Sequence, residues 1–308
     1  MRVAVTAPAT SANLGPGFDA FGICLERPFD TVVAKTTEGE GVTLEISGVG
    51  SESIPSDPRR NTAGRAALAV MRMSGFRGGV AICLKKGVRP GSGLGSSAAS
   101  AAASAVAVAR LAGGLPVEKI VEAAAEGESA SAGEEHADNV AASIMGGFTI
   151  VRSVHPASVI RIWPPRFLRL VLALPDLYVS TFEARKILPR RVPLASMVGN
   201  VAKASTMVAA MMKGDLALLG SAMEDSVVEP LRAKLIKGYG DVKRAALASG
   251  ASGVTVSGSG PAVLAVVDAK RASPSKVAAA MASAFGENGV GCETIISKVG
   301  RGAAIKAR

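Results

Sequence analysis

The sequence predicts an α+β protein built from two domains, and three observations carry this prediction. The chain has 308 residues, more than a single domain usually holds. Its strand-like and helix-like segments alternate irregularly, without the regular βα repeat of a doubly wound sheet. A proline-rich stretch at 153–167, "SVHPASVIRIWPPRF", marks a connection between domains. We therefore expect an N-terminal domain over 1–158 and a C-terminal domain over 159–308.

The N-terminal half begins with alternating apolar residues and continues into helical spacing. Strands are predicted at 2–7, 23–26, 29–37, 42–47, 79–86 and 146–154. The stretch 61–75 places Ala66, Ala69, Val70 and Met73 on one helical face, and Gly75 ends it. Further helices are predicted at 96–112, 116–127 and 134–144.

The C-terminal half repeats this mixture in a different order. Strands are predicted at 168–175, 176–181, 253–258, 262–267 and 291–297. Helices are predicted at 183–187, 195–212, 215–224, 241–249 and 275–286. No internal repeat is visible.

Composition narrows the class of protein. Hydrophobic residues make up 48% of the chain and charged residues 19%, as in a globular protein, and only 4% are aromatic, so the core must be aliphatic. The sequence contains no apolar run of about 18 residues, and "MRVAVTAPATSANLG" lacks the apolar stretch of a secretory signal. Cys24, Cys83 and Cys292 are scattered and form neither a zinc spacing nor a disulfide framework. We expect a cytoplasmic protein without a membrane partner.

The net charge of +10 suggests an anionic partner. The basic residues are dispersed, without an arginine-rich tract, and few aromatic side chains could stack on bases. We therefore expect no nucleic acid as partner and favour an anionic small molecule.

A glycine-rich loop precedes the alanine-rich helix predicted from Ser96. In "RPGSGLGSS" (89–97), Gly91, Gly93 and Gly95 alternate before the two serines. Glycine lets successive backbone N–H groups point at one spot, and a helix N-terminus adds its own free N–H groups, so the loop suits a phosphate. It matches neither the P-loop nor the dinucleotide fingerprint. A tight turn before a serine-capped, closely packed helix explains the same residues, and this loop alone does not decide between them.

Two further polar loops contain glycine. "PATSANLGPGFD" (8–19) offers Thr10, Ser11, Asn13 and Asp19 to a polar small molecule. "GASGVTVSGSGPAVLAV" (250–266) contains a second anion-friendly turn. Together the three loops favour a nucleotide or phosphate site.

The segments "PATSANLGPGFDAFG", "PGSGLGSSAAS" and "GVTVSGSGPAVLAV" resemble the three motifs of the GHMP small-molecule kinases, in the family's order. "GEEHADNVAASIMGGF", "STFEARKILP" and "EPLRAKLI" are similar to those members that phosphorylate homoserine, which extends the resemblance over nearly the whole chain. The resemblance implies an N-terminal domain with a left-handed βαβ unit and a C-terminal ferredoxin-like domain. It also implies ATP-dependent phosphorylation of the side-chain hydroxyl of L-homoserine to O-phospho-L-homoserine, in threonine biosynthesis.

The resemblance assigns the ATP site. The residues that would bind ATP are Asn61, Pro90, Gly91, Ser92, Gly93, Leu94, Gly95, Ser96, Ser97 and Ala98. Glu128 and a serine, Ser97 in preference to Ser96, would hold Mg²⁺. The catalytic residues would be Asn13, Glu128 and Ser97.

The resemblance also assigns the homoserine site. The residues that would bind homoserine are Asn13, Asp19, His136, Thr181, Arg185 and Arg232. Guanidinium forks suit the carboxylate, so Arg185 and Arg232 would bind it. Asp19 would bind the ammonium and Asn13 the hydroxyl. The first motif has no lysine to serve as a base, so the hydroxyl proton would pass to the phosphate.

Two departures and several alternatives remain open. Ala142 stands where many relatives carry proline, and Glu134 and Glu135 make the approach to His136 unusually acidic. Glu128 also fits an exposed helix acid, and Asn61 a helix N-cap. A kinase of mevalonate or shikimate, a silent ligand-binding relative and a homodimer are all compatible with the sequence.

Overall fold

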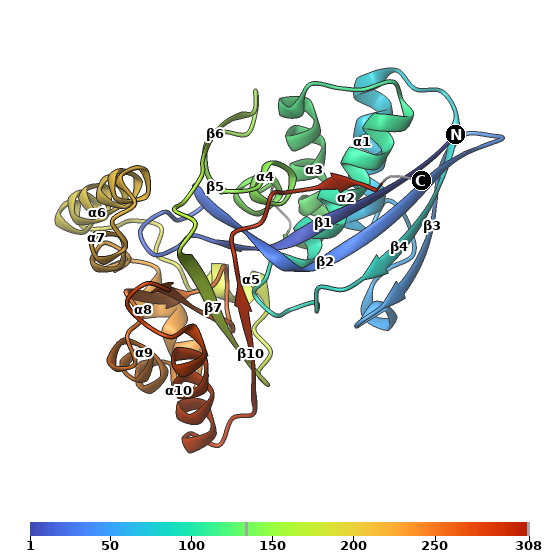
Figure 1. Ribbon diagram of the computed structural model, residues 1–308. Helices are drawn as coiled ribbons and strands as arrows, with labels where there is room; N and C mark the ends of the chain where they lie inside the picture. The colour runs from blue at the N-terminus through green and yellow to red at the C-terminus, as the bar shows by residue number, and fades with distance from the viewer. Residues whose placement is uncertain (133–134, 307–308) are drawn as a thin grey trace.

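The computed structural model describes residues 1–132 and 135–306 and contains two sheets (Figure 1). The first sheet has seven strands in the order β11-β1-β2-β4-β3, and β5 joins it to β6 by pairing with β2. Its strands are β1 (Arg2–Ala12), β2 (Phe21–Thr37), β3 (Gly41–Gly48), β4 (Gly79–Lys86), β5 (Phe148–Ser153), β6 (Ser158–Ile162) and β11 (Ala304–Ile305).

Four helices lie on one face of this sheet (Figure 1). They are α1 (Thr62–Ser74), α2 (Ser96–Leu111), α3 (Val117–Ala132) and α4 (Asp138–Met145). Three of them lie against the strands and one, α3, is packed on the other helices. In β2, Val32 and Ala34 are fully buried towards the helices, whereas Thr31 and Lys35 alternate with them on the other face. The predicted alanine-rich helix is α2, and its small residues let α1 and α3 pack closely against it.

The unit β3-α1-β4 joins two parallel neighbouring strands across a helix. Asn61 caps α1 by accepting hydrogen bonds from Ala63 N and Gly64 N. Gly75 ends the helix in the left-handed conformation, as the sequence predicts. The left-handed crossover of this unit stays an expectation from the family resemblance.

The second sheet is antiparallel, in the order β10-β7-β9-β8. Its strands are β7 (Leu168–Pro175), β8 (Gly253–Val256), β9 (Val263–Asp268) and β10 (Cys292–Ser297). Helices connect β7 to β8 and β9 to β10, which gives the ferredoxin-like topology that the resemblance implies. These helices are α5 (Thr181–Lys186), α6 (Leu194–Lys213), α7 (Leu216–Ser221), α8 (Glu229–Arg232), α9 (Tyr239–Ala248) and α10 (Pro274–Glu287).

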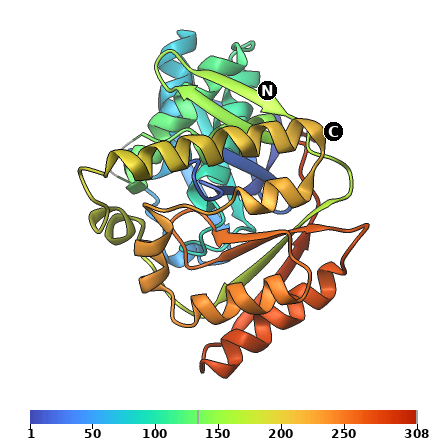
Figure 2. The same cartoon turned by 90° about the vertical axis from the view of Figure 1, so that its left-hand side faces the viewer.

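The two domains share an apolar core. Leu170 and Leu172 of β7 face α6 and the first domain, whereas Val171 between them faces α9 and α10. At the junction, the rings of Phe21 and Phe148 lie 5.1 Å apart, edge to face. The long helix α6 crosses beside the first domain in Figure 2. This shared core fixes the cleft between the domains.

Several predicted elements differ from the structure. The predicted strands 23–26 and 29–37 form one continuous strand, β2. The predicted strand 176–181 is wrong, because Asp176–Ser180 is a loop and Thr181 begins α5. The sequence missed β6, which lies in the predicted connection, and the short elements α8 and β11. The predicted helix 134–144 begins at Asp138, and Glu134 lies outside the described residues.

The chain leaves the first sheet after β6 and enters the second at Leu168. The predicted boundary at 158/159 falls at the first residue of β6 and stays a prediction. After β10 the chain returns, and β11 pairs with β1. Across the described ranges, helices of the length and apolar character needed to cross a membrane are not found.

Candidate active site

The three glycine-containing motifs meet at one point in the structure, although residues 8–12 of the first, predicted as a loop, belong to β1. The Ser257 hydroxyl donates to the Gly93 carbonyl at 2.7 Å and lies 2.8 Å from the Ser11 hydroxyl, so it connects all three motifs. Asn13 Nδ2 donates to the Gly258 carbonyl at 2.9 Å. A cleft of about 870 Å³ opens beside this junction, large enough for a nucleotide and a small substrate.

The glycine loop leads directly into the N-terminus of α2, as predicted. Gly91, Gly93 and Gly95 all have positive φ angles, which side-chain-bearing residues rarely adopt. A Cβ on Gly95 would lie 2.2 Å from Thr10 Oγ1, so the loop also approaches its neighbours too closely for any other residue. Gly95 occupies the cap position without a side chain, and the first N–H groups of α2 are left to a ligand.

A buried ion pair lies under this loop. The Lys86 ammonium pairs with Asp30, and both side chains are almost completely buried. Lys86 Nζ also donates to the Ser96 carbonyl and to the Ser100 hydroxyl, each at 2.8 Å. Burial lowers the pKa of Lys86, and the Asp30 carboxylate opposes this shift. The pair therefore holds the first turn of α2 against the end of β4.

The same pair holds the other end of the loop. Asp30 Oδ1 accepts hydrogen bonds from Gly87 N at 2.9 Å and Val88 N at 3.0 Å. The Ser96 hydroxyl donates to the Val88 carbonyl at 2.7 Å. The two ends of the glycine loop are thus fastened to each other through Asp30, Lys86 and Ser96.

We predict that Lys86→Met destabilises the protein by about 3–5 kcal/mol, because it leaves Asp30 buried without its cation. Urea unfolding at neutral pH measures the change in the free energy of unfolding. Asp30→Asn combined with Lys86→Met should cost less than the sum of the two single changes, because no buried charge then remains unpaired. A loss below about 1 kcal/mol for the single change would show that the ion pair does not fix this region.

Glu128 on α3 faces the start of α2. Its Oε2 accepts a hydrogen bond from the Ser97 hydroxyl at 3.0 Å. Its Oε1 is buried and has no hydrogen-bond partner among the residues that the structure describes. Burial raises the pKa of Glu128 to about 7, and the Ser97 hydrogen bond acts in the opposite direction. A buried carboxylate oxygen beside a hydroxyl is a donor set that fits a divalent cation.

A cluster of charges lines the same cleft. Arg185 contacts Asp19 through two hydrogen bonds, of 2.7 and 3.3 Å. Arg232 is buried, and its guanidinium donates to the Gly258 carbonyl at 2.7 Å. The Phe18 ring lies near both guanidiniums, with distances of 5.5 and 5.3 Å from its centroid to Arg185 and Arg232. Both arginines are therefore positioned before any ligand arrives.

Two residues of the cleft, Asp138 and Asn139, are absent from the predicted site. Asp138 is buried, and burial together with the nearby Asp19 carboxylate raises its pKa to about 6. Asn139 Oδ1 accepts a hydrogen bond from the Thr10 hydroxyl at 2.7 Å, beside Gly95. Their position at the start of α4, next to a predicted ligand residue, was the available signal.

The raised pKa of Asp138 predicts a pH-dependent stability. The folded pKa lies above the ordinary value of 3.8, so the neutral acid stabilises the fold fully below pH 3.8. This contribution is lost as the pH rises through about 6. Between pH 4 and 7, the free energy of unfolding of the ligand-free protein should fall more steeply with pH than that of Asp138→Asn. We predict that the two slopes differ by at most about 1.4 kcal/mol per pH unit. The exposed Asp176→Asn is the control, and an unchanged difference across this range would contradict the prediction.

The cleft brings most of the predicted site residues together. Those that line it are Asn13, Asp19, Asn61, Pro90, Gly91, Ser92, Gly93, Gly95, Ser96, Ser97, Glu128, His136, Thr181, Arg185 and Arg232. Leu94 and Ala98 do not line it, because both side chains are buried in the apolar cores. Asn61 uses both ends of its amide within the protein, as the cap of α1 and as donor to the Pro55 carbonyl.

Four further residues line the cleft, Lys86, Ser180, Gly258 and Ser259. Gly258 and Ser259 belong to the glycine turn that the sequence singles out, whereas Lys86 and Ser180 had no signal in the sequence. The Thr181 and Ser259 hydroxyls lie 3.3 Å apart and bring the start of α5 to the turn between β8 and β9. These contacts join segments far apart in the chain, so local patterns could not reveal them.

The family models agree with the fold and with this site. Residues 61–147 match the GHMP kinases N terminal domain, and residues 207–288 match the GHMP kinases C terminal domain. These matches define the class of protein as a two-domain kinase of the GHMP type.

Known relatives narrow the class. A homoserine kinase from Natronomonas pharaonis is 46% identical over 98% of this chain and 99% of its own length, and one from Pyrococcus abyssi is 44% identical with the same coverage. The solved homoserine kinase from Cytophaga hutchinsonii superimposes with a TM-score of 0.93 at 36% identity, over 99% of this chain and 97% of the other. The chain belongs to the homoserine kinases of the GHMP kinase superfamily.

A more distant solved structure shares the fold alone. The mevalonate kinase from L. major, in complex with R-mevalonate, has a TM-score of 0.70 at 17% identity, over 97% of this chain and 96% of the other. The fold is therefore common to kinases of different alcohols, and the substrate must be argued from the residues of the cleft.

Proposed function

We propose that the protein transfers the γ-phosphoryl group of ATP to the side-chain hydroxyl of L-homoserine, giving O-phospho-L-homoserine in threonine biosynthesis. The observation that carries this proposal is the pairing, in one cleft, of an amide-rich loop at a helix N-terminus with a cluster of two arginines and two acids. The loop suits a chain of phosphates, and the cluster suits a zwitterion. Family membership points to the same reaction.

At the ATP end, the loop 90–97 supplies backbone N–H groups to the phosphates. The Ser96 hydroxyl is engaged with Val88, so the Ser97 hydroxyl is the one directed to the ligand side. Leu94 and Ala98 can contribute through the backbone only, because their side chains are in the core. Asn61 also lines the cleft, and its amide is already hydrogen-bonded within the protein. Its position alone therefore supports a place near the adenine.

Glu128 and Ser97 would hold Mg²⁺. The unpaired Oε1 of Glu128 supports this assignment, because a buried carboxylate oxygen without a partner is costly unless a ligand completes it. When bound, the ion neutralises charge on the phosphates that it contacts. The Lys86 ammonium, which pairs with Asp30 under the loop, acts to lower the pKa of Glu128 and so favours its charged form.

At the substrate end, homoserine carries a carboxylate and an ammonium. Arg185 and Asp19 are paired with each other in the free protein. The substrate's carboxylate would pair with Arg185 and Arg232, and its ammonium would pair with Asp19, which lies near Asp138. This exchange of partners keeps every charge in the cleft compensated.

The transfer itself depends on position. Asn13 donates to Gly258 and accepts from Asp19 N, which leaves one lone pair of Oδ1 to accept from the substrate hydroxyl. His136 and Thr181 line the same part of the cleft and would complete the contacts with homoserine. The hydroxyl proton passes to the transferring phosphoryl group, while loop N–H groups stabilise its charge.

A substrate panel tests the proposal. Mg²⁺-dependent ADP release is measured with L-homoserine, L-threonine, shikimate and mevalonate, each across a concentration series. We expect the highest kcat/KM with L-homoserine, because shikimate and mevalonate have no ammonium for Asp19. Preference for an alcohol without an amino group would overturn the substrate assignment. Failure of all four to release ADP would favour a ligand-binding protein instead.

A further inference from the structure

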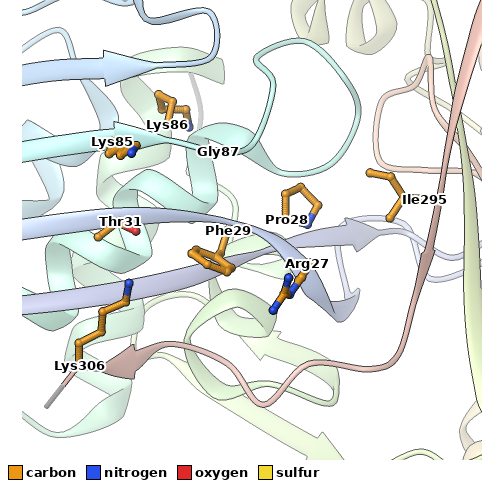
Figure 3. Close-up of a pocket in the computed structure, with 9 residues that line it drawn as sticks. All are labelled: Arg27, Pro28, Phe29, Thr31, Lys85, Lys86, Gly87, Ile295 and Lys306. Carbon is orange, nitrogen blue, oxygen red and sulfur yellow. The ribbon is translucent and has the colours of Figure 1, made fainter.

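A second cavity, of about 670 Å³, lies on the face of the first sheet that the helices do not cover. Figure 3 shows its residues, which come from β2, from the end of β4, from β10 and from the segment after β11. They are Arg27, Pro28, Phe29, Thr31, Lys85, Lys86, Gly87, Ile295 and Lys306. Three of the lining side chains, Arg27, Lys85 and Lys306, are exposed and cationic.

These three cations have no acidic neighbour in the lining. Within residues 1–132 and 135–306, none of the three side chains makes a hydrogen bond or an ion pair. The Lys306 ammonium lies 5.7 Å from the centroid of the Phe29 ring, whose side chain is itself exposed. Like charges gathered in one hollow raise the local concentration of anions. The charges of the cavity therefore favour a negatively charged ligand, and the exposed Phe29 ring adds an aromatic surface next to Lys306.

The register of the strands places a hydroxyl next to the cations. Thr31 of β2 lies directly opposite Lys85 of β4, and both project to the open face. Further along the same face, Arg2 lies opposite Lys35, and Glu45 of β3 lies beside Cys83. Along the described part of this face, the cations without an acidic neighbour are therefore the ones that line the cavity.

We propose that this cavity binds a small anion that carries a phosphate group, at a site separate from the active site. Three cations and a hydroxyl suit a group with two or more negative charges better than a single carboxylate. An amino acid is disfavoured, because no described residue of the lining is an acid that could receive its ammonium. The site goes beyond the proposed function, which makes no use of these side chains.

The cavity lies behind the phosphate loop of the active site. Lys85 projects into it, whereas the next residue, Lys86, turns its side chain to the other face and pairs with Asp30 under the loop. Gly87, the following lining residue, donates its N–H to Asp30. A ligand in the cavity therefore contacts the residues from which the loop starts.

Amide chemical shifts of the ¹⁵N-labelled full chain test the proposal, with inorganic pyrophosphate as the probe and no Mg²⁺ present. Pyrophosphate is expected to move two separate sets of signals, one from Gly93 and Gly95 in the loop and one from Thr31 and Lys85 in the cavity. In Lys85→Gln/Lys306→Gln, the affinity reported by the Thr31 signal should fall at least tenfold, while the loop signals titrate as before. L-homoserine should leave the cavity signals unmoved.

The matched control is Arg110→Gln/Lys276→Gln, which removes two exposed cations far from the cavity and should leave both titrations unchanged. The proposal is overturned if pyrophosphate up to millimolar concentration does not move the Thr31 signal. It is also overturned if the control weakens the cavity titration as much as the Lys85/Lys306 pair does, because binding would then reflect net charge. A response of the cavity signals to L-homoserine but not to pyrophosphate would assign the site to another class of ligand.

Discussion

Glu128→Gln lowers kcat by on the order of 10³-fold, while the affinity for ATP falls much less. The change keeps the shape and the hydrogen bond with Ser97 but removes the charge that would hold Mg²⁺. ATP would still be bound by the loop N–H groups, so the loss appears mainly in turnover. Steady-state kinetics with varied ATP and Mg²⁺, together with nucleotide binding by calorimetry, separate the two effects.

Glu118→Gln is the matched control, because this residue lies on the same helix and is exposed. It should change neither kcat nor KM. Unfolding of Glu128→Gln is not expected, because the wild-type carboxyl is itself a buried acid with a raised pKa. Turnover within a few-fold of the wild type would refute the metal assignment for Glu128.

Arg185→Ala raises the KM for L-homoserine roughly 10- to 100-fold, the amount expected for losing charge-assisted hydrogen bonds to a carboxylate. The KM for ATP should stay close to that of the wild type, because Arg185 contacts Asp19 and Phe18 of the first motif. Initial rates over a matrix of both substrate concentrations give the two constants independently.

Two further variants test whether the effect comes from the guanidinium of Arg185. Arg185→Lys keeps the charge but not the fork that now meets Asp19 in two contacts, so its KM should lie between those of wild type and Arg185→Ala. Arg190→Ala removes an exposed cation from the same segment and should leave both KM values unchanged. An unaltered KM for L-homoserine in Arg185→Ala would show that the carboxylate binds elsewhere.

Local patterns predicted the parts of the fold that local chemistry determines. The apolar face of α1, its Asn61 cap and its Gly75 stop lie within one segment and could be read directly. The glycine loop and the α2 N-terminus were predicted for the same reason. Ser97 and Glu128 came from the family resemblance, and the structure places them in contact.

Contacts between distant segments could not be predicted from such patterns. Asp30 and Lys86 read as ordinary polar residues on two strands, and only the pairing of β2 with β4 buries them together. The stretch 176–181 has apolar residues typical of a strand, but Asp176–Ser180 forms a loop that pairs with no described strand and lines the cleft, and Thr181 begins α5. Asp138 was overlooked because its charged neighbours, Asp19 and Arg232, come from remote elements.

The return of the chain to the first sheet has a consequence for synthesis on the ribosome. Val5 of β1 pairs with Ile305 of β11, so opposite ends of the described chain are neighbours in one sheet. The N-terminal domain can bury its helices early, but the edge of β1 that β11 covers stays open until β11 emerges. Nascent chains of this enzyme should therefore carry an exposed strand edge up to that point, where a chaperone that shields strand edges would be of most use.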